Sequence, residues 1–211
     1  MLEANQVDGI ISGSHNLGIE DYNRVTAPII AFDRNLSPEI PVVSSDNYAG
    51  GVLAAETLVK SGAKKIIMIT GNDNSNSPTG LRHAGFASVL PESMIINVSS
   101  DFSPIRKEME IKQILIHQKP DAIFASDDLT AILIMKVAKE LEIPVPQQLK
   151  VIGYDGTQFV QTYIPELTTI QQPIKEIAVL TVDLLLQKID GQTVATTGYF
   201  LPVSLHSGNS V

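Results

Sequence analysis

The sequence predicts a doubly wound α/β fold, in which parallel strands alternate along the chain with helices. Short apolar runs recur without polar alternation, a pattern typical of strands that are buried on both faces. Longer amphipathic stretches, bounded by capping residues, lie between these runs. Strand and helix signals that alternate this often indicate βαβ units and a parallel sheet.

Each predicted strand is an apolar run that ends at a cluster of Ser, Asp, Asn or Gly. The runs cover residues 7–11, 28–32, 42–43, 65–70, 94–98, 121–125 and 150–154. A late strand is predicted over residues 199–205. It contains Pro202, which places it at a sheet edge because proline has no backbone N–H to donate.

The predicted helices fill the intervals between these strands. They cover residues 47–61, 82–90, 104–117, 128–141 and 173–189. Asp46 or Asn47 can cap the first helix, and Gly62 can end it in the left-handed conformation. Pro104 suits the first turn of the third helix, where its missing N–H is not needed.

Composition excludes several classes of protein. The 211 residues contain 15 Lys+Arg and 23 Asp+Glu, which gives a net charge of −8. A chain this acidic lacks the basic stripe that contacts phosphates, so nucleic-acid binding by these residues is not expected. Cysteine is absent, which excludes disulfides and thiolate chemistry. The first residues do not read as a secretory signal, and no apolar run reaches the roughly 18 residues of a membrane span. The cytoplasm is therefore the expected location.

No catalytic, metal or cofactor motif is visible. Asp155-Gly156-Thr157 lacks the aspartate that a phosphotransferase carries two residues earlier, because Gly153 stands there. A nucleophile elbow is absent, and the four histidines do not show metal-binding spacing. The sequence therefore predicts a binding protein that is not an enzyme and has no cofactor.

Polar residues collect where the predicted strands end. Because ligands of open α/β sheets bind outside the carboxyl ends of the strands, these residues would line a common crevice. They are Ser12, Ser14, His15, Asp33, Arg34, Asp46, Asn72, Asp73, Asp101, Asp127, Asp128 and Asp155, with Phe102 beside Asp101. Carboxylates and an arginine suit a neutral polyhydroxylated ligand such as a sugar. For each aspartate the alternative role is to cap the following helix.

The helix predicted over residues 128–141 is apolar almost all round. Its first turns contain Leu129, Ala131, Ile132, Leu133 and Ile134. A helix on the face of a sheet normally keeps a polar outer stripe. Either other elements bury this helix, or its outer face contacts another subunit.

An ordered set of short motifs resembles the effector-binding domain of the LacI–GalR family of bacterial transcription regulators. The motifs run from residue 7 to about residue 207. They are Val7-Asp8-Gly9-Ile10-Ile11, Phe32-Asp33-Arg34, residues 46–51 (DNYAGG), Arg82-His83-Ala84-Gly85-Phe86, and then residues 121–128 (DAIFASDD), 151–155 (VIGYD), 165–173 (PELTTIQQP) and 201–205 (LPVSL).

The resemblance implies a two-lobed fold like that of type I periplasmic binding proteins, with ligand between lobes that close by hinge motion. Residues 1–45 and 173–196 would form the N-terminal lobe, and residues 46–171 and 197–211 the C-terminal lobe. The chain would cross between the lobes near Ser45, near Gln171 and Gln172, and near Thr197. The family's DNA-binding helix-turn-helix and its first two βα units have no counterpart here, so the first lobe is expected to be incomplete.

The resemblance also assigns roles to residues. Arg82 would grip ligand oxygens and face Asp33, and Phe102 would stack on a ring of the ligand. Asp127 and Asp155 would accept hydroxyl donors, and Asn76 and Ser14 would make secondary contacts. Many relatives have asparagine in place of Asp127, so the pattern of donors differs here. The contacts between subunits of a homodimer would come from Leu129, Ile132, Leu133 and Tyr163, the last within residues 158–164.

The function implied is that of the ligand-sensing, dimerising core of a transcriptional repressor. Ligand would bias lobe closure, and operator DNA would be read only through an N-terminal domain that this chain lacks. A periplasmic sugar-binding protein of a transport system is the alternative. The effector stays unidentified, although only Arg34 and Arg82 could balance the charge of a phosphorylated one. Replacing Arg82 with alanine is expected to abolish binding and to leave the fold largely intact.

Overall fold

The computed structural model describes residues 7–13, 25–71 and 77–211 and divides into two compact units. Unit 1 contains the residues up to Asp46 together with Pro173–Pro202. Unit 2 contains Asn47–Gln172 together with Val203–Val211. The chain therefore changes unit after Asp46, Gln172 and Pro202, the last of these beyond the position near Thr197 that was expected.

Unit 2 is built on a six-stranded sheet with the order β10-β8-β7-β6-β4-β5. All neighbouring pairs are parallel except β10 with β8. The strands are β4 (Ile66–Thr70), β5 (Met94–Asn97), β6 (Ala122–Ala125), β7 (Lys150–Asp155), β8 (Thr168–Gln171) and β10 (Ser204–His206). The helices are α2 (Asn47–Lys60), α3 (Pro78–Val89), α4 (Pro104–Gln118), α5 (Asp128–Glu140) and α6 (Gln158–Tyr163). Both the α/β class and the parallel-dominated sheet are as predicted.

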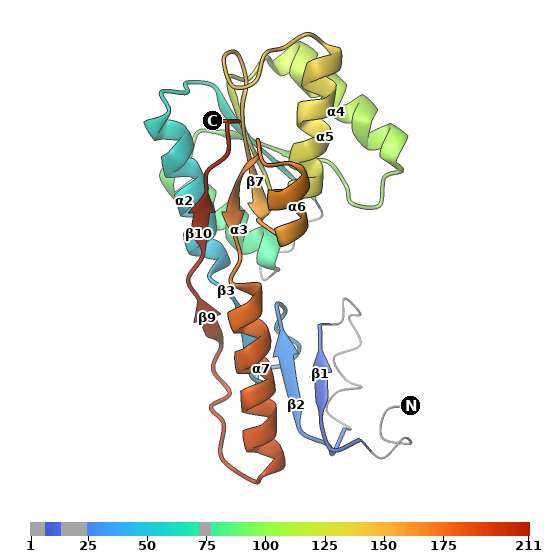
Figure 1. Ribbon diagram of the computed structural model, residues 1–211, viewed down its shortest axis with the longest axis vertical. Helices are drawn as coiled ribbons and strands as arrows, with labels where there is room; N and C mark the ends of the chain where they lie inside the picture. The colour runs from blue at the N-terminus through green and yellow to red at the C-terminus, as the bar shows by residue number, and fades with distance from the viewer. Residues whose placement is uncertain (1–6, 14–24, 72–76) are drawn as a thin grey trace. The chain divides into compact units, whose positions relative to one another are not determined.

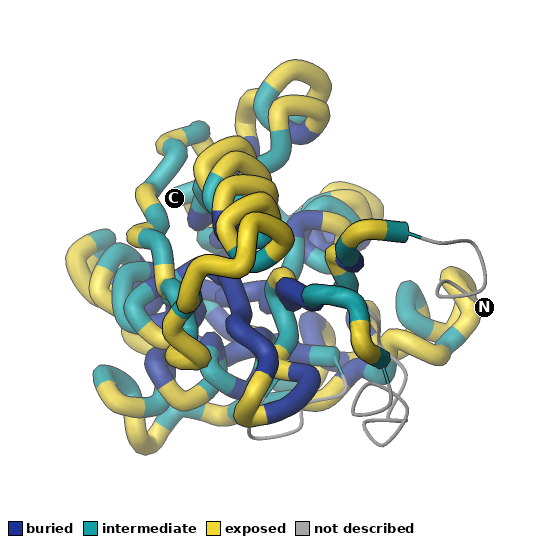
Figure 2. The backbone as a smooth tube through the Cα atoms, turned by 90° about the horizontal axis from the view of Figure 1, so that it is seen from below, coloured by how far each residue is buried: buried dark blue, intermediate teal, exposed yellow. Residues whose placement is uncertain are grey.

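Helices cover both faces of this sheet (Figure 1). Successive side chains of a strand point to opposite faces. In β4, Ile67 and Ile69 therefore pack with α4 and α5, whereas Ile66 and Met68 pack with α2 and α3. Figure 2 shows the buried segments of the chain in dark blue and the exposed residues, many of them on helical coils, in yellow. Burial on both faces explains why these strands read as continuous apolar runs.

Within its described residues, unit 1 contains a four-stranded parallel sheet with the order β1-β2-β3-β9 and the long helix α7 (Ile174–Ile189). Its strands are β1 (Ile10–Ser12), β2 (Ile29–Phe32), β3 (Val42–Ser45) and β9 (Tyr199–Leu201). Ile30 and Val43 are fully buried and cluster with Leu184 of α7. The helix therefore covers one face of this sheet.

Three local differences from the prediction have physical causes. Helix α3 begins at Pro78 and not at residue 82, because Ser77 caps it by accepting a hydrogen bond from the Gly80 N–H (3.0 Å). The late strand is two strands, β9 and β10, which lie in different sheets on either side of Pro202. Helix α6 and strand β8 were not predicted, since both are short and polar for their class. Among the described residues no helix is both long enough and apolar enough to span a membrane.

Candidate functional site

The candidate site lies where the strands of the unit 2 sheet end, and we call this carboxyl-terminal side of the sheet its carboxyl edge. Because β4, β6, β7 and β8 are parallel, their carboxyl ends meet at the same edge. Thr70 ends β4, Ser126 follows β6, Asp155 ends β7 and Gln172 follows β8. Helices α2 and α3 bring Asn47 and Arg82 to this edge, as the hydrogen bonds below show.

Arg82 is the centre of this site, and it is held on every side. The side chain is buried, with 6% of the residue exposed. Its Nε donates to Asn47 Oδ1 (2.8 Å), and its Nη1 donates to the Ser126 carbonyl oxygen (2.7 Å). The guanidinium carbon lies 3.7 Å from the centre of the Tyr154 ring, in cation–π geometry. Arg82 is therefore a fixed part of the protein as well as a candidate ligand contact.

Asp155 provides the partly open carboxylate of the site. Its Oδ1 lies 3.7 Å from Arg82 Nη2 and accepts a hydrogen bond from Gln172 Nε2 (2.7 Å). No hydrogen bond within the described residues uses Oδ2, so this oxygen can accept a hydroxyl. Burial raises the pKa of Asp155 to about 6, and the Arg82 charge opposes that shift. At neutral pH the carboxylate is ionised and accepts hydrogen bonds only.

Asp128 is a second, deeper carboxylate beside the same edge. It is 2% exposed and begins α5. Its Oδ1 accepts a hydrogen bond from Thr169 Oγ1 (2.6 Å), and its Oδ2 accepts one from the Gly156 N–H (2.8 Å). Burial raises the pKa of Asp128 to about 6, while these two hydrogen bonds oppose the shift.

A buried hydroxyl also lies at this edge. The Thr70 side chain is 2% exposed, and its Oγ1 has no hydrogen-bond partner among the described residues. Thr70 follows Met68 by two positions, so its side chain points to the α2–α3 face, on which Tyr154 also lies. A buried hydroxyl without a partner is favourable only when a water or a polar ligand satisfies it.

The predicted site residues separate into three groups. Arg82 and Asp155 lie together at this edge. Asp127 lies close by but caps α5, since its two carboxylate oxygens accept from the Thr130 N–H (2.7 Å) and hydroxyl (2.8 Å). The ligand contact predicted for Asp127 stays a prediction, in addition to this capping role. Asp33 belongs to unit 1, and its predicted ligand contact also stays a prediction. Ser14 and Asn76 lie outside the described residues.

Phe102 was predicted to stack on a ligand ring. It is half-buried and packs against the α4–α5 core. The Arg106 guanidinium carbon lies 3.6 Å from the centre of its ring, so one face of the ring already carries a cation. A ligand could use only the other face, and this contact also stays a prediction.

Sequence reasoning missed four residues that shape the site: Asn47, Tyr154, Thr169 and Gln172. Asn47 was considered as a helix cap and as part of the motif at residues 46–51, whereas its Oδ1 accepts a hydrogen bond from Arg82 Nε. Tyr154 occupies an apolar run and reads as core. Their positions in the sequence could have identified two of these residues, since Tyr154 and Gln172 directly adjoin the ends of strands.

The predicted dimer residues differ in exposure. Leu129 and Tyr163 are 75% and 68% exposed, and the Tyr163 ring lies 4.9 Å from that of Phe159. Ile132 and Leu133 are half-buried and pack against their own core. Helix α5 is therefore buried along most of its apolar surface, and only its first turn presents an open apolar side chain.

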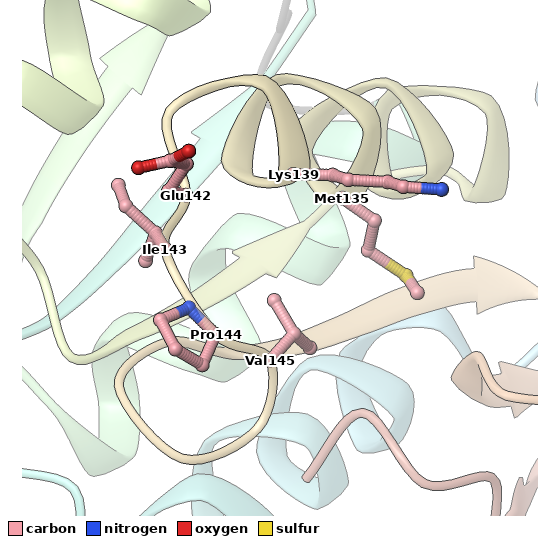
Figure 3. Close-up of a pocket in the computed structure, with 6 residues that line it drawn as sticks. All are labelled: Met135, Lys139, Glu142, Ile143, Pro144 and Val145. Carbon is pink, nitrogen blue, oxygen red and sulfur yellow. The ribbon is translucent and has the colours of Figure 1, made fainter.

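Two cavities of unit 2 lie on the opposite side of the sheet, where the strands begin. One, of about 420 Å³, is formed by the end of α5 and the turn that follows, with Met135, Ile143 and Val145 in its lining (Figure 3). The other, of about 500 Å³, lies beside the starts of β4 and β5. Neither contains a residue of the Arg82–Asp155 site, and the described residues offer no group of three His, Asp or Glu that could hold a metal ion.

Comparison with known proteins places this fold in one class. The family described as periplasmic binding protein-like domain matches residues 55–211. A solved periplasmic binding protein/LacI transcriptional regulator from Alkaliphilus metalliredigens, complexed with D-xylulofuranose, is similar over 100% of this chain and 80% of its own. The TM-score is 0.87 at 28% sequence identity. The chain is thus a periplasmic-binding-protein-like domain.

Two curated relatives show to which family of periplasmic-binding-protein-like domains this chain belongs. The sucrose operon repressor of Streptococcus mutans is 64% identical over 100% of this chain and 66% of its own length. The sucrose operon repressor of Lactococcus lactis is 51% identical over 99% of this chain and 65% of its own. This chain belongs to the LacI family of regulators, whose members here are repressors rather than enzymes. It spans a little under two thirds of the length of these relatives.

Proposed function

We propose that this chain is the sugar-sensing core of a LacI-type transcriptional repressor that acts in the cytoplasm. The observation that carries the proposal is the Arg82–Asp155 pair at the carboxyl edge of the unit 2 sheet. The fixed guanidinium and the half-open carboxylate can orient the hydroxyls of a polyol. The identity to two sucrose operon repressors supports sucrose, or a sugar derived from it, as the effector.

The charges at the edge favour an uncharged sugar. Arg82 already lies beside Asp155, and Asp128 and Asp127 add further negative charge near it. A phosphorylated ligand would bring more negative charge to a site whose described cation is already paired. Neutral hydroxyls, in contrast, supply the donors that an ionised carboxylate accepts.

The proposed partners follow from the same family. The repressor would act as a homodimer, with Leu129 and Tyr163 of unit 2 at the subunit contact. Operator DNA is assigned to no residue of this chain, since its net charge of −8 opposes binding to phosphates. The names of the relatives are those of repressors, which favours this function over the alternative of a transport-associated binding protein.

A thermal melt of the whole chain against sugars tests the proposal. The panel contains sucrose, D-fructose, D-glucose and D-ribose, together with sucrose 6-phosphate and fructose 6-phosphate. A ligand present at about 100 times its Kd adds about 2.7 kcal/mol to the free energy of unfolding, which raises the Tm by several degrees. A shift with an uncharged sugar that Asp155→Asn reduces is the expected result. A shift with the phosphates alone would overturn the charge argument, and a cooperative melt that no sugar moves would overturn the proposed function.

A further inference from the structure

Asp128 is buried, charged and assigned no role by the proposed sugar contacts. Its two carboxylate oxygens join three parts of unit 2. The residue itself begins α5, Oδ1 accepts from Thr169 in β8, and Oδ2 accepts from the Gly156 N–H in the turn after β7. Both partners are also buried, so water does not compete for these hydrogen bonds.

The turn that Asp128 holds has an unusual backbone. Asp155 has φ 122°, a value that residues with a side chain rarely adopt, and Gly156 has φ 58°. Such a conformation persists only when the surroundings enforce it. The Gly156 N–H belongs to the peptide group that joins Asp155 to Gly156, so the Asp128 hydrogen bond fixes the orientation of that peptide directly.

The neighbouring strand leaves room for this carboxylate. Gly153 lies in β7, and a Cβ atom placed on it would come within 2.3 Å of Asp128 Oδ1. Glycine at this position therefore allows Asp128 to enter the space between α5 and the sheet. The same position is the one at which a phosphotransferase-like motif would need its first aspartate.

We propose that Asp128 is a positioning residue for ligand recognition: through the Gly156 N–H and the Thr169 hydroxyl it holds the Asp155 carboxylate at the sheet edge. Asp128 itself touches no ligand. The expected effect on sugar affinity rests on the proposed function. The effect of Asp128 on the Gly156 turn does not, because it can be measured without any ligand.

Three variants of the whole chain test the proposal. Asp128→Ala removes both hydrogen bonds. Asp128→Asn keeps them, because its amide oxygen can accept from the Gly156 N–H while its NH₂ group donates to Thr169 Oγ1. Asp121→Ala is the matched control, since Asp121 accepts from the N–H groups of Lys64 (2.8 Å) and Lys65 (2.8 Å) at the opposite edge.

The first readout is amide hydrogen exchange at Gly156, measured by NMR without ligand. Asp128→Ala is expected to speed this exchange about tenfold relative to wild type, whereas Asp128→Asn and Asp121→Ala leave it within about 1.5-fold. If Asp128→Ala does not fold, Thr169→Val removes one of the two hydrogen bonds and is expected to speed the exchange about threefold. Exchange that is equal in all variants would overturn the proposal.

The second readout is affinity, measured by titration calorimetry with sucrose, D-fructose and D-glucose. Asp128→Ala is expected to weaken binding about tenfold, with recovery in Asp128→Asn and no change in Asp121→Ala. Equal losses in Asp128→Ala and Asp121→Ala would show a general effect on stability and overturn the positioning role. If wild type binds none of these sugars, the proposed function fails, while exchange at Gly156 still decides whether Asp128 holds the turn.

Discussion

Arg82 illustrates how one side chain can serve both the site and the core. Sequence reasoning expected a ligand contact that could be removed without harm to the fold. The contacts favour a different expectation, because the guanidinium donates to Asn47 and to the Ser126 carbonyl from a buried position. Removing a buried partner leaves acceptors that water cannot readily reach, and each such loss costs about 1–3 kcal/mol.

Arg82→Ala is therefore expected to lower the free energy of unfolding by about 3 kcal/mol, as well as to weaken ligand binding. Urea denaturation at pH 7 measures the change. Arg106→Ala is the matched control, because Arg106 is exposed and stacks on Phe102 outside the sheet edge. Losses of similar size in the two variants would contradict the structural role of Arg82.

The Asp155 carboxylate makes stability depend on pH. Its pKa of about 6 in the folded chain exceeds the value of about 3.9 expected when unfolded, so the folded state holds the proton more tightly. The stability that this group contributes is therefore fully present below about pH 4 and is lost as the pH rises to about 6. Asp128, with the same direction of pKa shift, adds to this trend.

Asp155→Asn is uncharged at every pH, so it is expected to flatten part of this decline and to leave the chain at least as stable as wild type at pH 7. At the same time it weakens sugar binding, the common trade between stability and function at binding sites. Urea unfolding at several values between pH 4 and pH 7.5 measures the slope, with Glu166→Gln at an exposed position as the control. A slope unchanged by Asp155→Asn would contradict the assignment.

At the scale of elements, the site depends on a close crossing of α2 and α3. A Cβ atom placed on Gly51 would lie 2.0 Å from the Arg82 carbonyl oxygen, and one placed on Gly85 would lie 2.0 Å from that of Tyr48. Only glycine permits this approach of the two backbones. The crossing brings Asn47, at the start of α2, to the side chain of Arg82.

Gly85→Ala is expected to push the two helices apart, to lower the free energy of unfolding by about 2–3 kcal/mol and to weaken ligand binding by displacing Arg82. Urea denaturation and titration calorimetry measure the two effects. Ala84→Ser adds one heavy atom at the exposed neighbouring position of the same helix, and we expect it to change neither quantity appreciably. A stable Gly85→Ala variant would show that the backbones can separate without consequence.

The same elements show what the sequence could and could not predict. Strands such as β4 and β6 were predictable, because burial on both faces demands a continuous apolar run. Arg82 and Asp155 were named from motif positions, and the structure brings them together. The cation–π contact with Tyr154 and the hydrogen bond from Gln172 were not predictable, because they join residues distant in sequence through side-chain geometry that no local pattern encodes.

At the scale of the whole molecule, the proposed repressor core would transmit ligand binding to a partner subunit. The proposed contact includes Leu129 on the first turn of α5 and Tyr163 at the end of α6, both largely exposed. Asp127 caps α5 and precedes Leu129 by two residues, while Asp128 anchors the same turn to the Gly156 turn beside Asp155. The proposed ligand edge and the proposed dimer contact therefore share one helical turn.

Leu129→Asp is expected to convert the proposed dimer to monomers, because an unpaired charge at an apolar subunit contact must lose its hydration. Sedimentation velocity over a concentration series measures the change. Ile132→Asp would be a less informative test, since Ile132 packs against its own core and its loss would also destabilise the monomer. Val59→Asp, at a half-exposed apolar position on α2, is the control. If Leu129→Asp sediments as wild type does, the subunit contact does not involve the first turn of α5. The proposal that this turn links the ligand site at Asp155 to a partner subunit would then also be wrong.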